Sequence, residues 1–158
     1  VDKYCFMQAL RILRTNSENQ DFVQLVHLLD QDLQRRDGAD HPFFAQFNKI
    51  DSIKYVVVAY MDLYPVGCGA IKEYDGETME VKRMFVTPEH RGNGVATAVL
   101  KELELWTMEL GFKKCILETG ERQPEAIGLY AKNKYHRIPN YGQYANVLTS
   151  VCFSKELE

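Results

Sequence analysis

The chain has 158 residues, enough for one domain whose core needs no metal or disulfide to hold it. Hydrophobic residues make up 46% and charged residues 26%, as in ordinary globular proteins, so disordered and fibrous classes are excluded. A net charge of −3 provides no overall attraction to nucleic acid or to an anionic membrane, and we expect neither as a partner.

The four cysteines, Cys5, Cys68, Cys115 and Cys152, are far apart and show no metal-ligand spacing. We expect them to be small buried thiols in a reducing compartment, and we expect no metal ion. No apolar run is long enough to span a bilayer and no signal peptide is visible, so a cytoplasmic location is expected.

Hydrophobic periodicity predicts a strand and two helices in the first third of the chain. Residues 8–14 alternate as in a strand. Apolar residues at helical spacing from Phe22 to Leu33 predict a helix that ends near residues 35–38. A shorter helix is expected over residues 41–50, with a proline near its first turn.

Three strand-like runs follow, at residues 54–61, 65–74 and 78–86. The connections between them are short and rich in turn-forming residues, so an antiparallel meander is expected.

The second half of the chain continues with two helices and up to three strands. They are expected at residues 95–110 (helix, with Gly111 just beyond its end), 113–119 (strand), 124–133 (helix), 135–138 (strand) and within 146–157 (strand). No linker or repeat interrupts this order, so residues 1–158 are predicted to form a single domain. The class is α/β or α+β, with a mixed sheet covered by helices.

The segment VTPEHRGNGVA, residues 86–96, joins a predicted strand to a predicted helix through mostly bare backbone. Five or six N–H groups in residues 91–96 have no obvious partner, and the helix dipole adds partial positive charge there. Gly92 and Gly94 remove Cβ atoms that would hold a ligand away, and Arg91 adds a full charge. A phosphate or pyrophosphate is the expected ligand, although the pattern matches neither the Walker loop nor the dinucleotide fingerprint.

This R-x-x-G-x-A loop (residues 91–96) and its flanking segments resemble the GNAT superfamily of acyl-CoA-dependent N-acyltransferases. The resemblance is carried by residues 81–106, by GFKKCILET at 111–119, and by PEAIGLYAKNKYHRIPNYGQY at 124–144. It implies a mixed, mostly antiparallel sheet of six or seven strands flanked by about four helices. It also implies acetyl transfer from acetyl-CoA to a primary amine by direct attack within a ternary complex.

The resemblance further implies which residues hold acetyl-CoA. The loop amides would bind the pyrophosphate, and the hydroxyl of Thr97 could donate a further hydrogen bond to a phosphate. The preceding strand would offer backbone hydrogen bonds to the pantetheine arm at the point where two strands splay apart. One amide of that strand would polarise the thioester carbonyl. The residues assigned to acetyl-CoA on this basis are Met84, Phe85, Val86, Arg91, Gly92, Asn93, Gly94, Val95, Ala96 and Thr97.

Amine attack on a thioester benefits from a general base and a general acid. Tyr130 matches the helix tyrosine that serves as acid in the resembled family, although a tyrosine there could simply pack in the core. Glu80 is the first candidate base, because period 2 places it on the same strand face as Met84. The alternative for Glu80 is a solvated or ion-paired acid. Glu118 is a second candidate base, and a water chain is a third.

The acceptor is left open by the sequence as a small-molecule or peptide amine. Arg35 and Arg36 could clamp an acceptor carboxylate, although surface positions are more common for such residues. Late tyrosines could line the acceptor side or pack the sheet edge: Tyr130, Tyr135, Tyr141 and Tyr144. Several acids could form a mouth for a cationic amine: Glu73, Asp75, Glu77, Glu80 and Glu118. A homodimer is an open expectation, and the rival function is a non-catalytic acyl-CoA-binding module on the same fold.

Two positions depart from the resembled family. Lys134 stands where a glycine usually follows the last predicted helix. Because lysine disfavours the left-handed conformation, we expect the helix to end one residue earlier, with Asn133 in that conformation. Gln123 replaces an asparagine that contacts CoA in the family, so this contact is in doubt.

Overall fold

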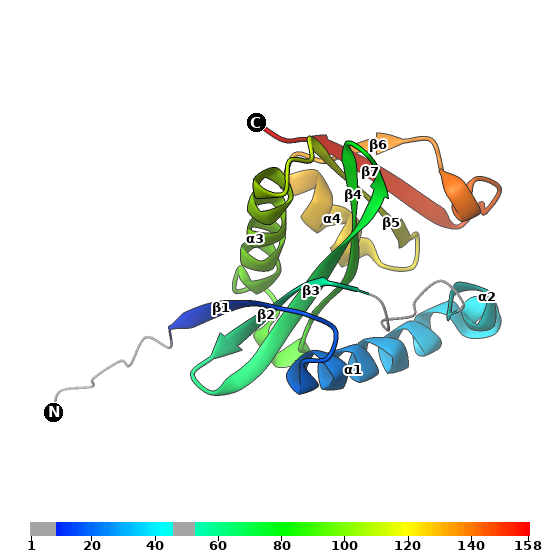
Figure 1. The fold of residues 1–158 in the computed structure, drawn as a ribbon. Helices are drawn as coiled ribbons and strands as arrows, with labels where there is room; N and C mark the ends of the chain where they lie inside the picture. Colours follow the sequence, from blue (N-terminus) through cyan, green and yellow to red (C-terminus); the bar gives the residue numbers. More distant parts are fainter. Residues whose placement is uncertain (1–8, 46–52) are drawn as a thin grey trace, which may run out of the picture.

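Within residues 9–45 and 53–158, which this computed structural model describes, seven strands form one sheet. They are β1 (Leu10–Thr15), β2 (Tyr55–Met61), β3 (Tyr64–Asp75), β4 (Thr78–Val86), β5 (Lys114–Gly120), β6 (His136–Ile138) and β7 (Ser150–Glu156). Their order across the sheet is β1-β2-β3-β4-β5-β7-β6 (Figure 1). Neighbours pair antiparallel except β4 and β5, which are parallel. The expected mixed, mostly antiparallel sheet is therefore confirmed.

Four α-helices lie in the same described residues: α1 (Gln20–Asp37), α2 (His41–Ala45), α3 (Val95–Glu109) and α4 (Pro124–Lys132). The side chain of Asn19 caps α1 by accepting a 3.0 Å hydrogen bond from the amide of Phe22. The helix expected at 41–50 is confirmed as far as residue 45, and the rest lies outside the described residues. No helix in the described ranges is long and apolar enough to cross a lipid bilayer.

The two faces of the sheet carry separate cores, because side chains alternate along each strand. Val56 and Val58 of β2 pack with the apolar stripe of α1. The alternate residues of the same strand, Val57 and Ala59, pack with α3 and α4 on the other face. Figure 1 shows α1 on one side of the sheet and α3 on the other. The site described below lies between these layers.

β4 contains a bulge that breaks this alternation. Cys68 of β3 lies opposite Phe85, whereas Ala70 lies opposite Lys82, so three steps on β4 match two on β3. The extra residue is Arg83, whose φ of 58° lies in the left-handed region.

The bulge overturns one expectation about the candidate base. Met79 and Val81 pack in the core beneath α3, so Glu80, between them, points to the opposite face. Met84 nevertheless packs against the α3 core, because the extra residue has reversed the alternation. The expectation that Glu80 and Met84 share a face is therefore wrong.

The end of α4 also differs from expectation. Lys134 has a φ of 69°, whereas Asn133 has a φ of −90°, so the lysine and not the asparagine is left-handed. The amide of Tyr135 donates to the carbonyl of Tyr130 at 3.0 Å, and that of Lys134 donates to the carbonyl of Ala131 at 3.2 Å. These paired bonds satisfy the last carbonyls of the helix. They compensate for the cost of about 1 kcal/mol of a left-handed non-glycine residue.

Candidate active site

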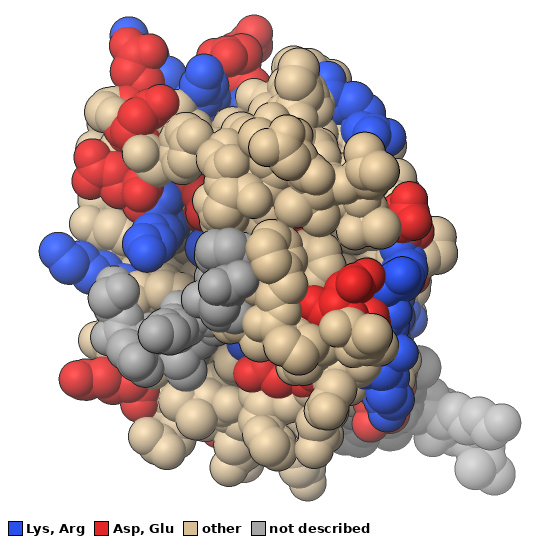
Figure 2. Space-filling model, turned by 90° about the vertical axis from the view of Figure 1, so that its right-hand side faces the viewer, with Lys and Arg blue, Asp and Glu red and all other residues tan. Residues whose placement is uncertain are grey.

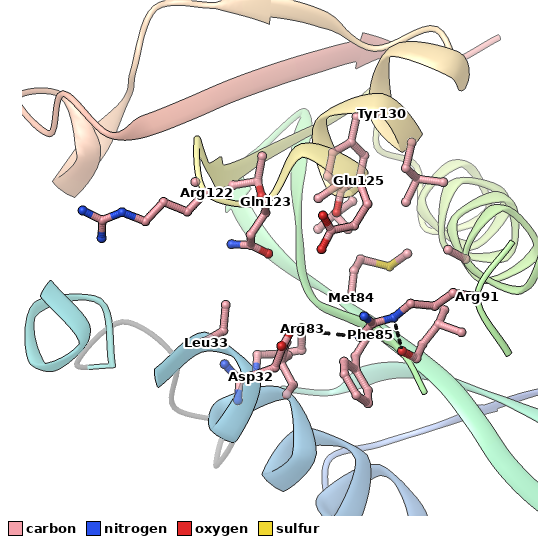
Figure 3. A pocket seen from close by; sticks show the side chains of 18 of the residues that line it. Asp32, Leu33, Arg83, Met84, Phe85, Arg91, Arg122, Gln123, Glu125 and Tyr130 are labelled. Carbon is pink, nitrogen blue, oxygen red and sulfur yellow. Dashed lines mark hydrogen bonds and ion pairs between the residues drawn. The ribbon is translucent and has the colours of Figure 1, made fainter. Parts of the chain in front are cut away.

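A cavity of about 390 Å³ opens where β4 and β5 diverge (Figure 3). The pairing of the two strands runs from Thr78 and Lys114 to Glu80 and Ile116 and then stops. Beyond this point residues 81–86 of β4 and 117–120 of β5 line the cavity in part, without pairing to each other. Peptide groups that would complete a ladder are thus available for an extended ligand between the strands.

The R-x-x-G-x-A loop forms one end of the cavity. Gly92 and Gly94 both have a φ of 81°, which glycine adopts without strain, and a Cβ on either would meet no protein atom within 4 Å. The first bond of α3 joins the amide of Ala98 to the carbonyl of Gly94. Within the described part of the chain, no acceptor is found for the N–H groups of residues 92–97.

The set of free amides begins one residue later than the sequence suggested. The amide of Arg91 donates to the carbonyl of Pro88 at 3.4 Å, which closes the 3-10 turn Pro88–His90. The amide of Thr97, at the start of α3, joins the set instead. The Thr97 hydroxyl accepts a 3.4 Å hydrogen bond from the side chain of Asn133.

The Arg91 side chain ties the loop to the end of β4. Its Nε donates to the carbonyl of Val86 at 2.9 Å, and its guanidinium lies over the Phe85 ring. An Nη of Arg91 is 4.0 Å from an oxygen of Asp32 on α1 (Figure 3). The charge at this end is therefore held in place from two sides.

Glu118 and Tyr130 both line the cavity. Tyr130 is 5% exposed and packs edge-on against Tyr135, with 5.7 Å between ring centroids. Burial and the nearby Glu118 raise the pKa of Tyr130. Burial raises the pKa of Glu118 to about 7, and the positive charge of Lys82 opposes the rise. The structure thus brings together a neutral hydroxyl and a carboxyl group that titrates near neutral pH.

Glu80 is not among the residues that line the cavity. It is 8% exposed, and its Oε2 accepts a 2.5 Å hydrogen bond from the Tyr141 hydroxyl. Its Oε1 lies 3.5 Å from Nζ of Lys82. These contacts join β4 to the segment between β6 and β7.

The late tyrosines divide into two groups. Tyr130 and Tyr135 pack in the core, and the Tyr135 hydroxyl donates to Glu104 at 3.0 Å. Tyr141 packs between Tyr74 and Tyr144, with ring centroids 5.3 and 5.9 Å away. Tyr141 and Tyr144 therefore shape the segment between β6 and β7.

The expected acidic mouth is not assembled. Glu73, Asp75 and Glu77 lie at the turn between β3 and β4 and do not line the cavity. Five other carboxylates line it, of which the sequence identified only one for this role: Asp32, Asp37, Glu118, Glu121 and Glu125. Their distant positions in the chain explain why spacing did not reveal them.

Arg36 links α1 to α4 instead of standing free as a carboxylate clamp. Its guanidinium pairs with Glu125 of α4 and, at 3.1 Å, with Asp32 of α1. Arg122 reaches back to donate to the carbonyl of Asp37 at 2.9 Å. In Figure 3 the side chains of Gln123 and Glu125 point into the cavity, on the side opposite Asp32.

Figure 2 shows the side of the molecule on which α2 and the segment between β6 and β7 lie. Acidic and basic side chains alternate around a largely uncharged centre on this face. No broad field of one sign covers the part of this face that the described residues form.

Comparison with known proteins agrees with this arrangement. A sequence model of the acetyltransferase (GNAT) family matches residues 20–135. The IAA acetyltransferase of Azospirillum brasilense is 37% identical over 93 residues, which span 58% of this chain and 61% of that protein. The matched part thus covers less than two thirds of that relative's length.

Two solved structures share the fold over almost the whole chain. A Klebsiella pneumoniae protein assigned as an acyl-CoA N-acyltransferase has a TM-score of 0.80 at 24% identity, covering 96% of this chain and 99% of that one. A GNAT family acetyltransferase from Elizabethkingia anophelis, solved with acetyl-CoA bound, has a TM-score of 0.68 at 17% identity, covering 94% and 98%. At these identities the likeness concerns the fold. With the family match over residues 20–135, it establishes that the chain belongs to the GNAT family of acetyltransferases.

Proposed function

We propose that the protein is an acetyl-CoA-dependent N-acetyltransferase that transfers the acetyl group directly to a primary amine. One observation carries the proposal: Glu118 and Tyr130 line the same cavity as the free amides of the R-x-x-G-x-A loop. An anion-binding end and a pair of proton-transfer groups are thus joined in one space.

The residues present fit acetyl-CoA. Free amides at a helix N-terminus, with no Cβ over Gly92 and Gly94, suit a pyrophosphate. The unpaired stretch of β4, which includes Met84, Phe85 and Val86, suits an extended pantetheine arm. Val95, Ala96 and Thr97 also line the cavity, and Asn93 lies between the two glycines of the loop, so we propose all four for the loop side of the donor site. Bound there, acetyl-CoA would supply an activated acetyl thioester.

Glu118 is the group that we propose as general base. An acceptor amine is protonated at neutral pH and must lose a proton before it can attack. A carboxylate whose pKa is about 7 can take that proton and still release it to water. Glu80, the first candidate from the sequence, is held by Tyr141 outside the cavity lining, so we assign it to positioning.

Tyr130 is proposed as the general acid. Because its pKa is raised, its hydroxyl keeps its proton at neutral pH and can donate it to a departing thiolate sulfur. Packing against Tyr135 and Phe153 fixes the ring, which limits where the hydroxyl can point.

The rival function is an acyl-CoA-binding module without catalysis. It would need the loop but not a base and an acid in the same cavity, so Glu118 and Tyr130 favour the enzyme. Acyl groups larger than acetyl are a further alternative for the same site.

Two measurements test the proposal. Calorimetric titration with acetyl-CoA should show saturable binding, and no binding at millimolar concentration would exclude the cofactor assignment. Thiol release should then be followed across a panel of diamines, amino acids and peptides, with tertiary amines as matched controls that cannot form a stable amide. Binding without amine-dependent CoA release would favour the binding module.

A further inference from the structure

The bulge residue Arg83 is held by an ion pair that no step of the proposed chemistry uses. Its side chain is 2% exposed, and an Nη lies 2.6 Å from Oδ1 of Asp30 on α1. Among the described residues, Asp30 is the only acid that pairs with this guanidinium. The Arg83 Nε is buried and has no hydrogen-bond partner there. A buried guanidinium with one partner depends strongly on that partner.

The ion pair matters for the backbone because Arg83 is the extra residue of the bulge in β4. Arg83 is left-handed, which a residue with a Cβ adopts only when its surroundings require it. Its carbonyl oxygen faces Cys68 of β3, whose Sγ lies 3.4 Å away. The side chain is anchored beneath α1 while the carbonyl is anchored on β3, so both ends of the residue are fixed.

The conformation of Arg83 decides how the next residues are presented. Phe85 packs in the core beneath α1, whereas Met84 and Val86 face the core beneath α3. Without the extra residue each of these side chains would point to the other face, because the period along a strand is two. All three residues line the cavity and are those proposed to contact the pantetheine arm.

We infer that the Asp30–Arg83 ion pair is a positioning device that fixes the bulge and thereby aims the backbone of Met84 to Val86 at the donor site. The inference rests on the proposed function for its catalytic consequence. Asp30 and Arg83 act through the amides that follow the bulge and do not touch the reacting atoms. Displacement of such an amide by a fraction of an ångström weakens its bond to a developing oxyanion more than its bond to the ground-state carbonyl.

The variant Asp30→Asn tests the pair with little change in shape, because Asp30 is on the helix surface and its side chain is 48% exposed. We expect the turnover number to fall about tenfold, while the affinity for free CoA, which lacks the thioester carbonyl, changes by less than about twofold. Asp30→Glu keeps the charge and should restore most of the turnover.

Glu102→Gln is the matched control. Glu102 joins α3 to Arg14 of β1 at 2.7 Å and does not line the cavity, so its loss should leave turnover unchanged. The control likewise removes one carboxylate from a strand-to-helix ion pair, while Arg14 keeps its pair with Glu109. Calorimetric CoA-binding stoichiometry gives the folded fraction by which each turnover number is divided.

Backbone amide exchange provides a readout that does not depend on activity. In Asp30→Asn, exchange over residues 83–86 should accelerate about tenfold, whereas in Glu102→Gln it should match the wild type. Unchanged exchange there, or a turnover number within twofold of the Glu102→Gln value, would overturn the inference. If the wild type releases no CoA with any amine, the proposed function fails, and the exchange measurement still decides whether the pair holds the bulge.

Discussion

One wall of the cavity comes from a single short stretch of chain, whereas the opposite wall is assembled from segments far apart in the sequence. The end of β4, the R-x-x-G-x-A loop and the start of α3 follow one another within residues 84–97. On the other side, Arg122 reaches the carbonyl of Asp37 across 85 positions, and Arg36 of α1 pairs with Glu125 of α4. Under the proposed function, the local wall would hold the acetyl-CoA donor. The assembled wall, which depends on segments far apart in the sequence, would then contact the acceptor.

The largest expected effect comes from Glu118, which lines the cavity and is the proposed base. Glu118→Gln removes the proposed base, and we expect the turnover number to fall about 100-fold. In the wild type the rate should fall as pH drops through about 7, because Glu118 must be ionised to accept a proton. The variant should lack this acid limb in a pH profile of kcat/KM.

Glu80→Gln separates the two candidate bases. It weakens the hydrogen bond from Tyr141, because a neutral amide oxygen replaces the carboxylate as acceptor, so a loss of about threefold with an unchanged acid limb is expected. A larger loss than in Glu118→Gln would return the base role to Glu80.

Tyr130→Phe tests the proposed acid with almost no change in packing. Turnover should fall about tenfold, with acetyl-CoA affinity unchanged, since the hydroxyl acts only as the thiolate departs. Tyr135→Phe is the matched control: its ring is the neighbour of Tyr130, but its hydroxyl bonds to Glu104 away from the cavity. Equal turnover in the two variants would remove the acid role from Tyr130.

The local wall is tested by Gly94→Ala. A φ of 81° disfavours alanine, and its Cβ would project from a loop that otherwise presents only backbone. We expect acetyl-CoA affinity to fall about fivefold, measured by calorimetry, with a small change in turnover at saturation. Gly76→Ala places the same methyl group at an open turn outside the left-handed region and should leave affinity unchanged.

The smallest effect is expected at the assembled wall. Glu125→Gln breaks the ion pair of Arg36 with α4 while Asp32 still holds the guanidinium. Because half-exposed pairs contribute little, we expect the KM for the amine to change about two- to threefold, with acetyl-CoA affinity unaffected. If acetyl-CoA affinity changed more than the KM for the amine, the two walls would not divide donor from acceptor.

Most of the fold could be predicted from periodicity, because buried valines on alternate faces of β2 and the apolar stripe of α1 record which faces meet the core. The bulge at Arg83 could not, since a left-handed arginine is unfavourable locally and exists only because Asp30 and Cys68 hold it. The left-handed conformation of Lys134 could not be predicted from the sequence either, because it follows from the hydrogen bonds that end α4.

The sequence by itself determined the R-x-x-G-x-A loop, because free amides and two glycines at the start of a helix are encoded within a few adjacent residues. It also identified Tyr130 and, as one of two acids, Glu118. Only the tertiary structure separates Glu118, which lines the cavity, from Glu80, which does not. Burial beside the cavity sets the pKa of Glu118, and a hydrogen bond from Tyr141 holds Glu80 away from it. Such choices depend on residues that meet only after folding, and spacing along the chain carries no record of them.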